Sequence, residues 1–471
     1  MRVLLLQPRE EKGVGLQSLL RVEPLGLEMI AGALSTAHEV DLLDLRADDR
    51  DLDSVLSDFR PEVVGISSSF TMGAPQALNI AMHVKALCPE TFIVMGGQHP
   101  SLLPTDFHHE AVHAIVVGEG EAAFRELIDA LAVDGDLATI PGLVLNRPDR
   151  QEFTKVRRPL ADLDTLPFPQ RSLTRHIRGH YHLFRRSPIA SIETTRGCPH
   201  QCSFCAVWRF YQGKVRFKSP ERVVRELEMI EERDVFFTDD NFLANANRTK
   251  VILDLIRQRG LDKRYFVQAR SDSIVKHPDL VAAWRDIGLD NVFIGFEKPD
   301  QDGLDSLNKH NSAENNEAAL DILRKLGIEP LTSFIVDPEY DHRSFETLRA
   351  YVHKLRLKRP LFSVLTPLPG TAMFEEVREH LSTHDYRLFD LVHAVVPTRL
   401  DVADFYQEMA RLYRAAYPRW KLMLAHFFLT MDRFVSARAR AYSKGGMMKD
   451  VFRLCRSDGY GSRHLDKMAQ S

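Results

Sequence analysis

The sequence contains no run of about 18 apolar residues, the length that a membrane-spanning helix needs. It also lacks the apolar core and small-residue cleavage site of a secretory signal peptide, so we expect a cytoplasmic protein. The net charge of -3 over 471 residues gives no general attraction to nucleic acid, and no nucleic-acid partner is expected. Glycine and proline are not enriched, which excludes fibrous and low-complexity chains.

Cysteine is scarce as well. The 5 cysteines are too few for a disulfide scaffold in a chain of this length. Three of them, Cys198, Cys202 and Cys205, lie within eight residues of sequence. In a reducing compartment such clustering indicates metal binding before disulfide pairing. Cys88 and Cys455 are far from the cluster in sequence, and we expect both to be unpaired and inert.

Short apolar segments alternate with helical patterns through residues 1–140, which we assign to one domain. This alternation predicts an α/β fold with a doubly wound, Rossmann-like parallel sheet, in which ligands bind beyond the carboxyl ends of the strands. The expected strands are residues 3–6, 40–45, 63–66, 92–95 and 114–117.

A connector is expected over residues 141–188, because 146–150 has the composition of a turn and prolines keep 166–170 extended. A second alternating series over 189–390 predicts a partial (β/α)6 barrel, whose sites form at the carboxyl ends of the strands. Residues 391–471 are expected to form a helical C-terminal region. The expected barrel strands are 191–194, 235–238, 266–269, 292–296, 332–336 and 362–365.

The cysteines Cys198, Cys202 and Cys205 are spaced C-x3-C-x2-C in a loop that directly follows the first barrel strand. Three thiolates on one loop suit an iron–sulfur cluster, because soft sulfur ligands favour iron in such clusters. A cubane has four irons, so three cysteines leave one iron open for a substrate or cofactor. A zinc site is the alternative, and it would need a fourth ligand such as His200.

With Phe204 as its aromatic residue, this motif resembles the signature of radical S-adenosylmethionine (SAM) enzymes. The resemblance implies a [4Fe–4S] cluster on the three cysteines, with SAM chelating the open iron. It further implies cleavage of SAM to a 5′-deoxyadenosyl radical that abstracts hydrogen from an unactivated carbon. An electron donor of the flavodoxin or ferredoxin type is then expected.

Charged residues at three later strand ends fit the same resemblance. Asp239 or Asp240 suits the SAM ammonium group, although either residue could instead cap a helix. Arg270 could pair with the SAM carboxylate. Gly295 permits close approach of the backbone, and Glu297 can bond the ribose or the amino group. The alternative for each charged residue is a structural ion pair.

No G-x-G-x-x-G motif follows the first strand, and Gly118-Glu-Gly120 is a weak match to a dinucleotide site. The strand ends resemble B12-binding domains instead, which implies cobalamin. The D-x-H-x-x-G motif of His-ligated B12 proteins is absent, so we expect no histidine ligand on the lower face even though a histidine is nearby. The candidate cobalamin-binding residues are Thr71, Gly96, Gly97, His99, Gly118 and Gly120.

Both domains together resemble cobalamin-dependent radical SAM enzymes. Residues 21–27 and 332–338 look most like the hopanoid C-3 methylase branch, which implies methylation of an unactivated carbon of a small-molecule or lipid substrate by methylcobalamin. The alternatives are an oxidative cyclase or other non-methylating B12 radical SAM enzyme, and a cobalamin or iron–sulfur sensor without turnover.

Residues 420–431 are strongly apolar but too short to span a bilayer, and cations follow them. We expect a helix that packs on the barrel. The alternative is an interfacial anchor, which would place the protein in peripheral contact with a membrane.

Overall fold

The computed structural model describes residues 1–9, 20–184, 186–417, 454–456 and 460. The contacts divide the chain into two compact units. Unit 1 consists mainly of the N-terminal strand and residues 23–178, and unit 2 of residues 179–208 and 217–417. No helix within these described residues is long and apolar enough to cross a membrane. The apolar segment 420–431 lies outside the described residues.

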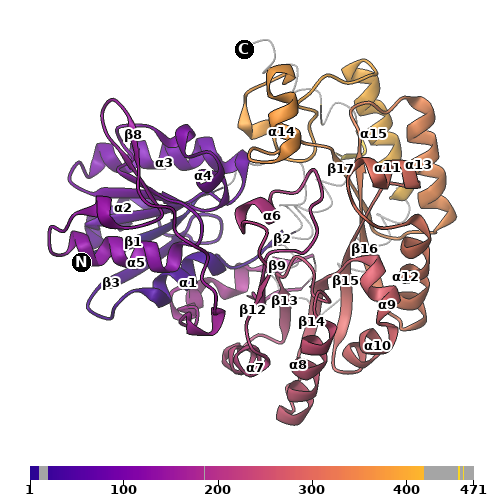
Figure 1. Cartoon of the computed structure of the whole chain (residues 1–471), viewed down its shortest axis with the longest axis horizontal. Coiled ribbons are helices and arrows are strands. Elements are labelled where there is room, and N and C mark those ends of the chain that lie inside the picture. The colour runs from indigo at the N-terminus through magenta and orange to yellow at the C-terminus, as the bar shows by residue number, and fades with distance from the viewer. Residues whose placement is uncertain (10–19, 185, 418–453, 457–459, 461–471) are drawn as a thin grey trace. The chain divides into compact units, whose positions relative to one another are not determined.

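A seven-stranded sheet forms the centre of unit 1, in the order β3-β1-β4-β5-β6-β7-β8 (Figure 1). Strands β3, β1, β4, β5 and β6 are parallel, which confirms the expected doubly wound sheet. Their ends differ from the expected ends by at most one residue. These strands are β1 (Arg2–Gln7), β3 (Glu39–Asp44), β4 (Val63–Ser67), β5 (Phe92–Gly96) and β6 (Ala114–Val116).

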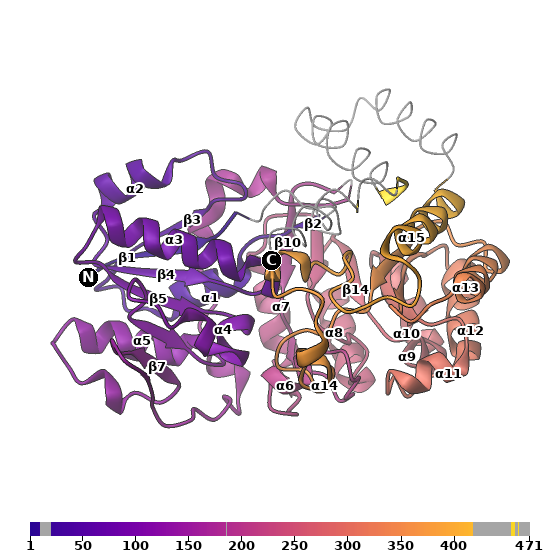
Figure 2. The same ribbon diagram turned by 90° about the horizontal axis from the view of Figure 1, so that it is seen from above.

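Helices cover both faces of this sheet (Figure 2). Helices α1 (Leu25–Ala33) and α5 (Gly120–Leu131) pack on the face that includes Val3. Helices α2 (Leu52–Phe59) and α3 (Ala74–Leu87) lie on the other face. Because successive strand residues point to opposite faces, strands buried on both sides are apolar without interruption, as β1 and β4 are.

The sheet continues into the segment that was expected to be a connector. Strands β7 (Leu143–Asn146) and β8 (Gln151–Phe153) extend it in antiparallel orientation beyond β6. The predicted turn is present as their hairpin, in which the Arg147 N–H donates to the Arg150 carbonyl (2.8 Å). The sequence pattern missed both strands because they are short and β8 is largely polar.

Six parallel strands form an open arc in unit 2, and their spatial order equals their order in the chain (Figure 1). This is the expected partial barrel, and each expected strand overlaps the observed one. The strands are β10 (Ile189–Ile192), β13 (Asp234–Phe237), β14 (Arg264–Gln268), β15 (Leu289–Glu297), β16 (Glu329–Val336) and β17 (Pro360–Val364).

The main core of unit 2 lies between the strands and the helices outside them. Alternate strand residues such as Ala190, Val235 and Ile294 belong to this core, because side chains alternate between the two faces of a strand. The outer helices are α7 (Pro220–Met229), α8 (Ala246–Arg259), α10 (Pro278–Asp286), α12 (Ala313–Lys325) and α13 (His342–Lys354). Within the described part of residues 391–471, α15 (Val402–Ala416) packs on α13 and β17.

Charged residues gather at the amino-terminal ends of the barrel strands. The Asp234 carboxylate accepts hydrogen bonds from Arg186 (3.1 Å) and Arg264 (2.5 Å), and Arg186 also pairs with Asp290. Asp234 is 5% exposed, so its charge depends on these two guanidinium partners. The ion cluster therefore ties β13, β14 and β15 together at the end opposite the expected site.

Asp234→Ala should lower the apparent free energy of unfolding of the barrel by about 2 kcal/mol, because Arg264 loses its carboxylate partner and Arg186 keeps only Asp290. Asp262→Ala is the matched control. It removes the partner of Arg233 in an exposed pair and should cost less than about 1 kcal/mol. Urea unfolding of both variants measures the difference. Equal losses would contradict a stabilising role for this ion cluster.

Candidate functional site

The predicted barrel residues all follow strands at the same end of unit 2. The cysteine loop follows β10, Asp239 and Asp240 follow β13, Arg270 follows β14, and Glu297 is the last residue of β15. Parallel strands end at one edge, so these groups come together. The pKa of Cys198 responds to both Asp240 and Arg270, as expected for neighbouring charges.

The three clustered cysteines are free thiols, and the described residues contain no disulfide. Cys202 is buried, whereas Cys198 and Cys205 are half-buried, as is Phe204 between them. Burial raises the pKa of all three thiols, that of Cys205 to about 12. Such thiols need a neighbouring cation to ionise, and a bound metal cluster supplies one.

No three His, Cys, Asp or Glu side chains in the described part of the chain are arranged to hold a single metal ion. The zinc alternative would need His200 together with the three thiols on one ion. A cubane binds each cysteine through a different iron, so its ligands are spread more widely than those of one ion. Three neighbouring thiols on one loop therefore fit an iron–sulfur cluster.

Asp239 is engaged in the fold. It is 1% exposed, and its Oδ1 accepts the backbone N–H groups of Thr194 (2.6 Å) and Thr195 (2.9 Å). Its Oδ2 accepts the Thr194 hydroxyl. Burial raises the pKa of Asp239, and these hydrogen bonds oppose the rise. The carboxylate thus joins the end of β13 to the segment that leads into the cysteine loop.

Asp240 has different surroundings. Its side chain is exposed, and among the described residues its carboxylate has no ion pair and accepts a hydrogen bond only from its own backbone N–H. Desolvation by the surrounding protein, together with the Asp239 and Glu193 carboxylates, raises the pKa of Asp240 to about 7. Neither aspartate caps α8, whose cap is Asn245. Asp240 is therefore the carboxylate that remains available to a ligand.

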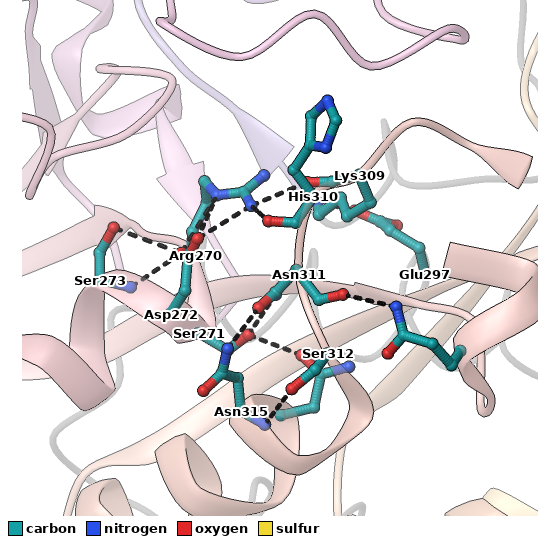
Figure 3. Close-up of polar contacts among 12 residues, drawn as sticks. Arg270, Ser271, Asp272, Ser273, Glu297, Lys309, His310, Asn311, Ser312 and Asn315 are labelled. Carbon is teal, nitrogen blue, oxygen red and sulfur yellow. Dashed lines mark hydrogen bonds and ion pairs between the residues drawn. The ribbon is translucent and has the colours of Figure 1, made fainter. Parts of the chain in front are cut away.

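Arg270 is held by a network of hydrogen bonds (Figure 3). Its Nε and Nη2 bond the Asp272 carboxylate, and Nη2 also donates to the carbonyls of Lys309 (2.8 Å) and His310 (2.9 Å). Within the described residues, Nη1 has no recorded partner. The predicted role of Arg270 as a partner for a carboxylate therefore depends on this single nitrogen.

Glu297 and Gly295 form one structural element. Glu297 is 6% exposed, has a φ of 62°, and accepts a hydrogen bond from Lys309 Nζ on its Oε1 (2.6 Å). A Cβ at Gly295 would lie 1.9 Å from that Oε1. Gly295 therefore provides the space into which the Glu297 carboxylate folds back. Lys309 was not among the predicted site residues, because it lies in a polar loop without a recognisable motif.

The predicted cobalamin residues lie at the carboxyl ends of β4, β5 and β6 in unit 1. His99 is 2% exposed, and its ring nitrogens contact Thr71 Oγ1 (3.3 Å) and the Asp106 carboxylate (3.0 Å). Both nitrogens are thus engaged within the domain. The hydroxyl of Ser68, at the end of β4, is buried without a partner in the described residues.

The glycines at these strand ends have two kinds of environment. A Cβ at Gly97 would lie 2.6 Å from the Ser68 carbonyl, and one at Gly120 would lie 2.8 Å from Ile30, so both serve close internal packing. Gly118 has no atom within 4 Å of that position, and Gly96 has only an ordinary contact at 3.9 Å. Gly96 and Gly118 are therefore the glycines that leave room for a flat ligand.

Ser101 connects these loops, although it was not among the candidate cobalamin-binding residues. Its hydroxyl donates to the Gly97 carbonyl (2.6 Å) and accepts the Gly118 N–H (2.9 Å). The loops after β5 and β6 are thus fixed relative to each other before any ligand binds.

Comparison with known proteins assigns both domains. Residues 11–128 match the B12 binding domain, and residues 192–352 match the radical SAM superfamily. The chain is 34% identical over 407 residues to the hopanoid C-3 methylase of Methylococcus capsulatus, covering 85% of this chain and 77% of that protein. It is 27% identical over 441 residues to an uncharacterized methyltransferase of Pyrococcus horikoshii, covering 91% and 95%.

A solved structure has the same fold. The radical SAM methyltransferase TsrM from Kitasatospora setae, with cobalamin and a [4Fe-4S] cluster bound, matches with a TM-score of 0.70 and 19% identity over 96% of this chain and 99% of that chain. At this identity the match supports the fold alone. The two domain matches and the 34% identical relative show the family as well. The protein belongs to the cobalamin-dependent radical SAM methyltransferases, which use a [4Fe–4S] cluster, SAM and cobalamin.

Proposed function

We propose that Cys198, Cys202 and Cys205 hold the [4Fe–4S] cluster and leave one iron for SAM. The observation that carries this proposal is the set of three neighbouring thiols at the mouth of the partial barrel. Positive charges support it, because Lys309 and Arg270 both lower the pKa of Cys202 against the effect of burial. Phe204, half-buried in the same loop, is the candidate aromatic contact of this centre.

We assign the SAM-binding residues by asking which charged side-chain atoms are not engaged in contacts within the fold. Asp240 is the proposed partner of the SAM ammonium group, because its carboxylate is exposed near the thiols while Asp239 is engaged by Thr194. Arg270 Nη1 is the proposed partner of the SAM carboxylate. Oε1 of Glu297 accepts a hydrogen bond from Lys309, which leaves Oε2 for a ribose hydroxyl or the amino group of SAM.

In unit 1 the proposed cobalamin surface is the group of strand ends after β4, β5 and β6. Gly96 and Gly118 leave space for the corrin ring, and the buried Ser68 hydroxyl is available to hydrogen-bond a ligand. His99 and Thr71 support this surface through their mutual contact, and Gly97 and Gly120 keep its loops closely packed. We propose that no histidine of this surface binds cobalt.

When bound, the cluster and SAM supply a 5′-deoxyadenosyl radical, and cobalamin supplies the methyl group. The residues of the chain bind these groups, orient them and exclude water. A low-potential electron donor of the flavodoxin or ferredoxin type is the proposed redox partner.

The proposed substrate is a hopanoid lipid, methylated at C-3. The support is the relative of that name, which aligns over most of both chains. A saturated polycyclic ring carries no acidic proton and no nucleophile, so hydrogen abstraction by a radical is a suitable route to methylation. Such a lipid resides in a bilayer, so the enzyme must reach the membrane surface to bind it. The apolar residues 420–431 and the cations that follow them in sequence suit such a peripheral contact.

Replacing any one of Cys198, Cys202 or Cys205 by Ala should abolish both cluster loading and formation of 5′-deoxyadenosine, because a cubane with two protein ligands is not retained. Iron and sulfide content after anaerobic reconstitution measures the first effect, and chromatography of the reaction the second. Cys88→Ala is the control and should keep the iron content of the wild type. A normal cluster in any of the three variants would overturn the ligand assignment.

Asp240→Asn should weaken SAM binding by about tenfold, because it removes a charge-assisted hydrogen bond to the ammonium group. Asp239→Asn should instead lower the thermal unfolding midpoint, because an amide cannot accept all three hydrogen bonds from Thr194 and Thr195. Equilibrium dialysis with SAM and thermal unfolding separate the two effects. Wild-type SAM affinity in Asp240→Asn would show that this carboxylate is not the ligand.

Deletion of the gene should remove 3-methylhopanoids from the host and leave the unmethylated parents in place. Lipid extraction and mass spectrometry measure both. Reintroduction of the wild-type gene should restore the methylated lipids, and the Cys202→Ala gene should not. Unchanged 3-methylhopanoids in the deletion strain, or a host without hopanoids, would refute this substrate. A product that has lost two hydrogens without gaining a methyl group would point to the cyclase alternative.

A further inference from the structure

The loop between α11 (Gln301–Ser306) and α12 contacts Arg270 and Glu297 of the proposed SAM site (Figure 3). We call residues 307–311 of this loop the 307–311 segment. Its first two residues bond the cysteine loop, because the Leu307 carbonyl accepts the Ser203 N–H (3.1 Å) and Asn308 Nδ2 donates to the Gln201 carbonyl (2.8 Å). Asn308 and His310 both have positive φ, 51° and 48°, so the backbone turns sharply on either side of Lys309.

The remaining residues of the segment bond the two strand ends next to it. The carbonyls of Lys309 and His310 accept hydrogen bonds from Arg270, and Lys309 Nζ donates to Glu297. Asn311 Nδ2 donates to Ser271 Oγ (2.7 Å), directly after Arg270. The segment thus contacts the cysteine loop and the ends of β14 and β15.

Lys309 stands out because it contacts both charged side chains at once. Its ammonium group donates a hydrogen bond to Oε1 of Glu297, and its carbonyl accepts one from Nη2 of Arg270. What remains for a ligand is Oε2 of Glu297 and Nη1 of Arg270. Lys309 is itself 7% exposed, so it does not provide an exposed charge for substrate.

We propose that Lys309 is a positioning residue for SAM. It fixes the orientation of the Glu297 carboxylate and, through the 307–311 segment, links that carboxylate and Arg270 to the loop that carries the cluster cysteines. This inference rests on the SAM assignment proposed above. It goes beyond that assignment by naming a residue that acts on SAM only through Glu297 and Arg270.

The test is a double-mutant cycle on SAM affinity, measured by anaerobic equilibrium dialysis of the reconstituted full-length protein. Lys309→Met should weaken SAM binding by about tenfold or more, because the buried Glu297 carboxylate loses its partner and its fixed orientation. Lys309→Arg keeps the charge and should recover most of the affinity. In a Glu297→Gln background, Lys309→Met should cause little further loss. Because Lys309 also lowers the pKa of Cys202, SAM affinity is compared per cluster-loaded protein, with the iron content of every variant measured alongside.

The double variant Glu297→Gln/Lys309→Met contains no unpaired buried charge, so it keeps the test possible if Lys309→Met alone does not fold. Lys354→Met removes the exposed partner of Glu317 and is the control for loss of a lysine elsewhere in the barrel. A second readout is the change that SAM causes in the electron paramagnetic resonance spectrum of the reduced cluster. That change should be reduced in Lys309→Met at SAM concentrations that saturate the wild type.

Equal losses of affinity in both backgrounds would overturn the inference, because Lys309 would then act independently of Glu297. Wild-type affinity in Lys309→Met would overturn it as well. These results differ from a failure of the SAM assignment itself. In that case Glu297→Gln alone would bind SAM as tightly as the wild type.

Discussion

Asp239, Arg270, Glu297 and Lys309 are each less than 10% exposed, and a buried charge without a partner costs several kcal/mol. The arrangement of the barrel mouth follows from this constraint. Asp239 is stabilised by hydrogen bonds from the segment that follows β10, and Glu297 is paired with Lys309. Arg270 is shared between Asp272 and two backbone carbonyls. Each pairing also fixes a loop, so one set of contacts both stabilises the charges and shapes the site.

The same pairings separate the polar atoms that serve the fold from those left for a ligand. Among the described residues, one carboxylate oxygen of Glu297, one guanidinium nitrogen of Arg270 and the exposed Asp240 carboxylate have no hydrogen bond or ion pair with another residue. These three groups match the charges and hydroxyls of SAM. Unit 1 shows a similar division, because His99, Ser101 and Gly97 are engaged in internal contacts while Gly96, Gly118 and the Ser68 hydroxyl face space or lack a partner.

Much of the fold could be predicted from the sequence, because buried parallel strands are short apolar runs that helices separate. Strands β7 and β8 were missed since β8 is three residues long and mostly polar. The sequence predicted at which strand ends the site residues lie, but not which of their atoms remain available to a ligand. Asp239 and Asp240 are neighbours of one residue type, and only the contact with Thr194 distinguishes them. Lys309 was missed because its pairing with Glu297 depends on positive φ angles in the loop around it, which the sequence pattern does not reveal.

The central claim is that Asp239 and Lys309 are engaged in contacts within the fold, and that Asp240, Arg270 and Glu297 bind SAM. An anaerobic crystal structure of the cluster-loaded protein with SAM tests this most directly. We predict the SAM amino nitrogen within hydrogen-bond distance of Asp240, with the Asp239–Thr194 and Glu297–Lys309 contacts retained. A structure in which Asp239 leaves Thr194 to bind SAM, or in which Lys309 leaves Glu297, would contradict the account.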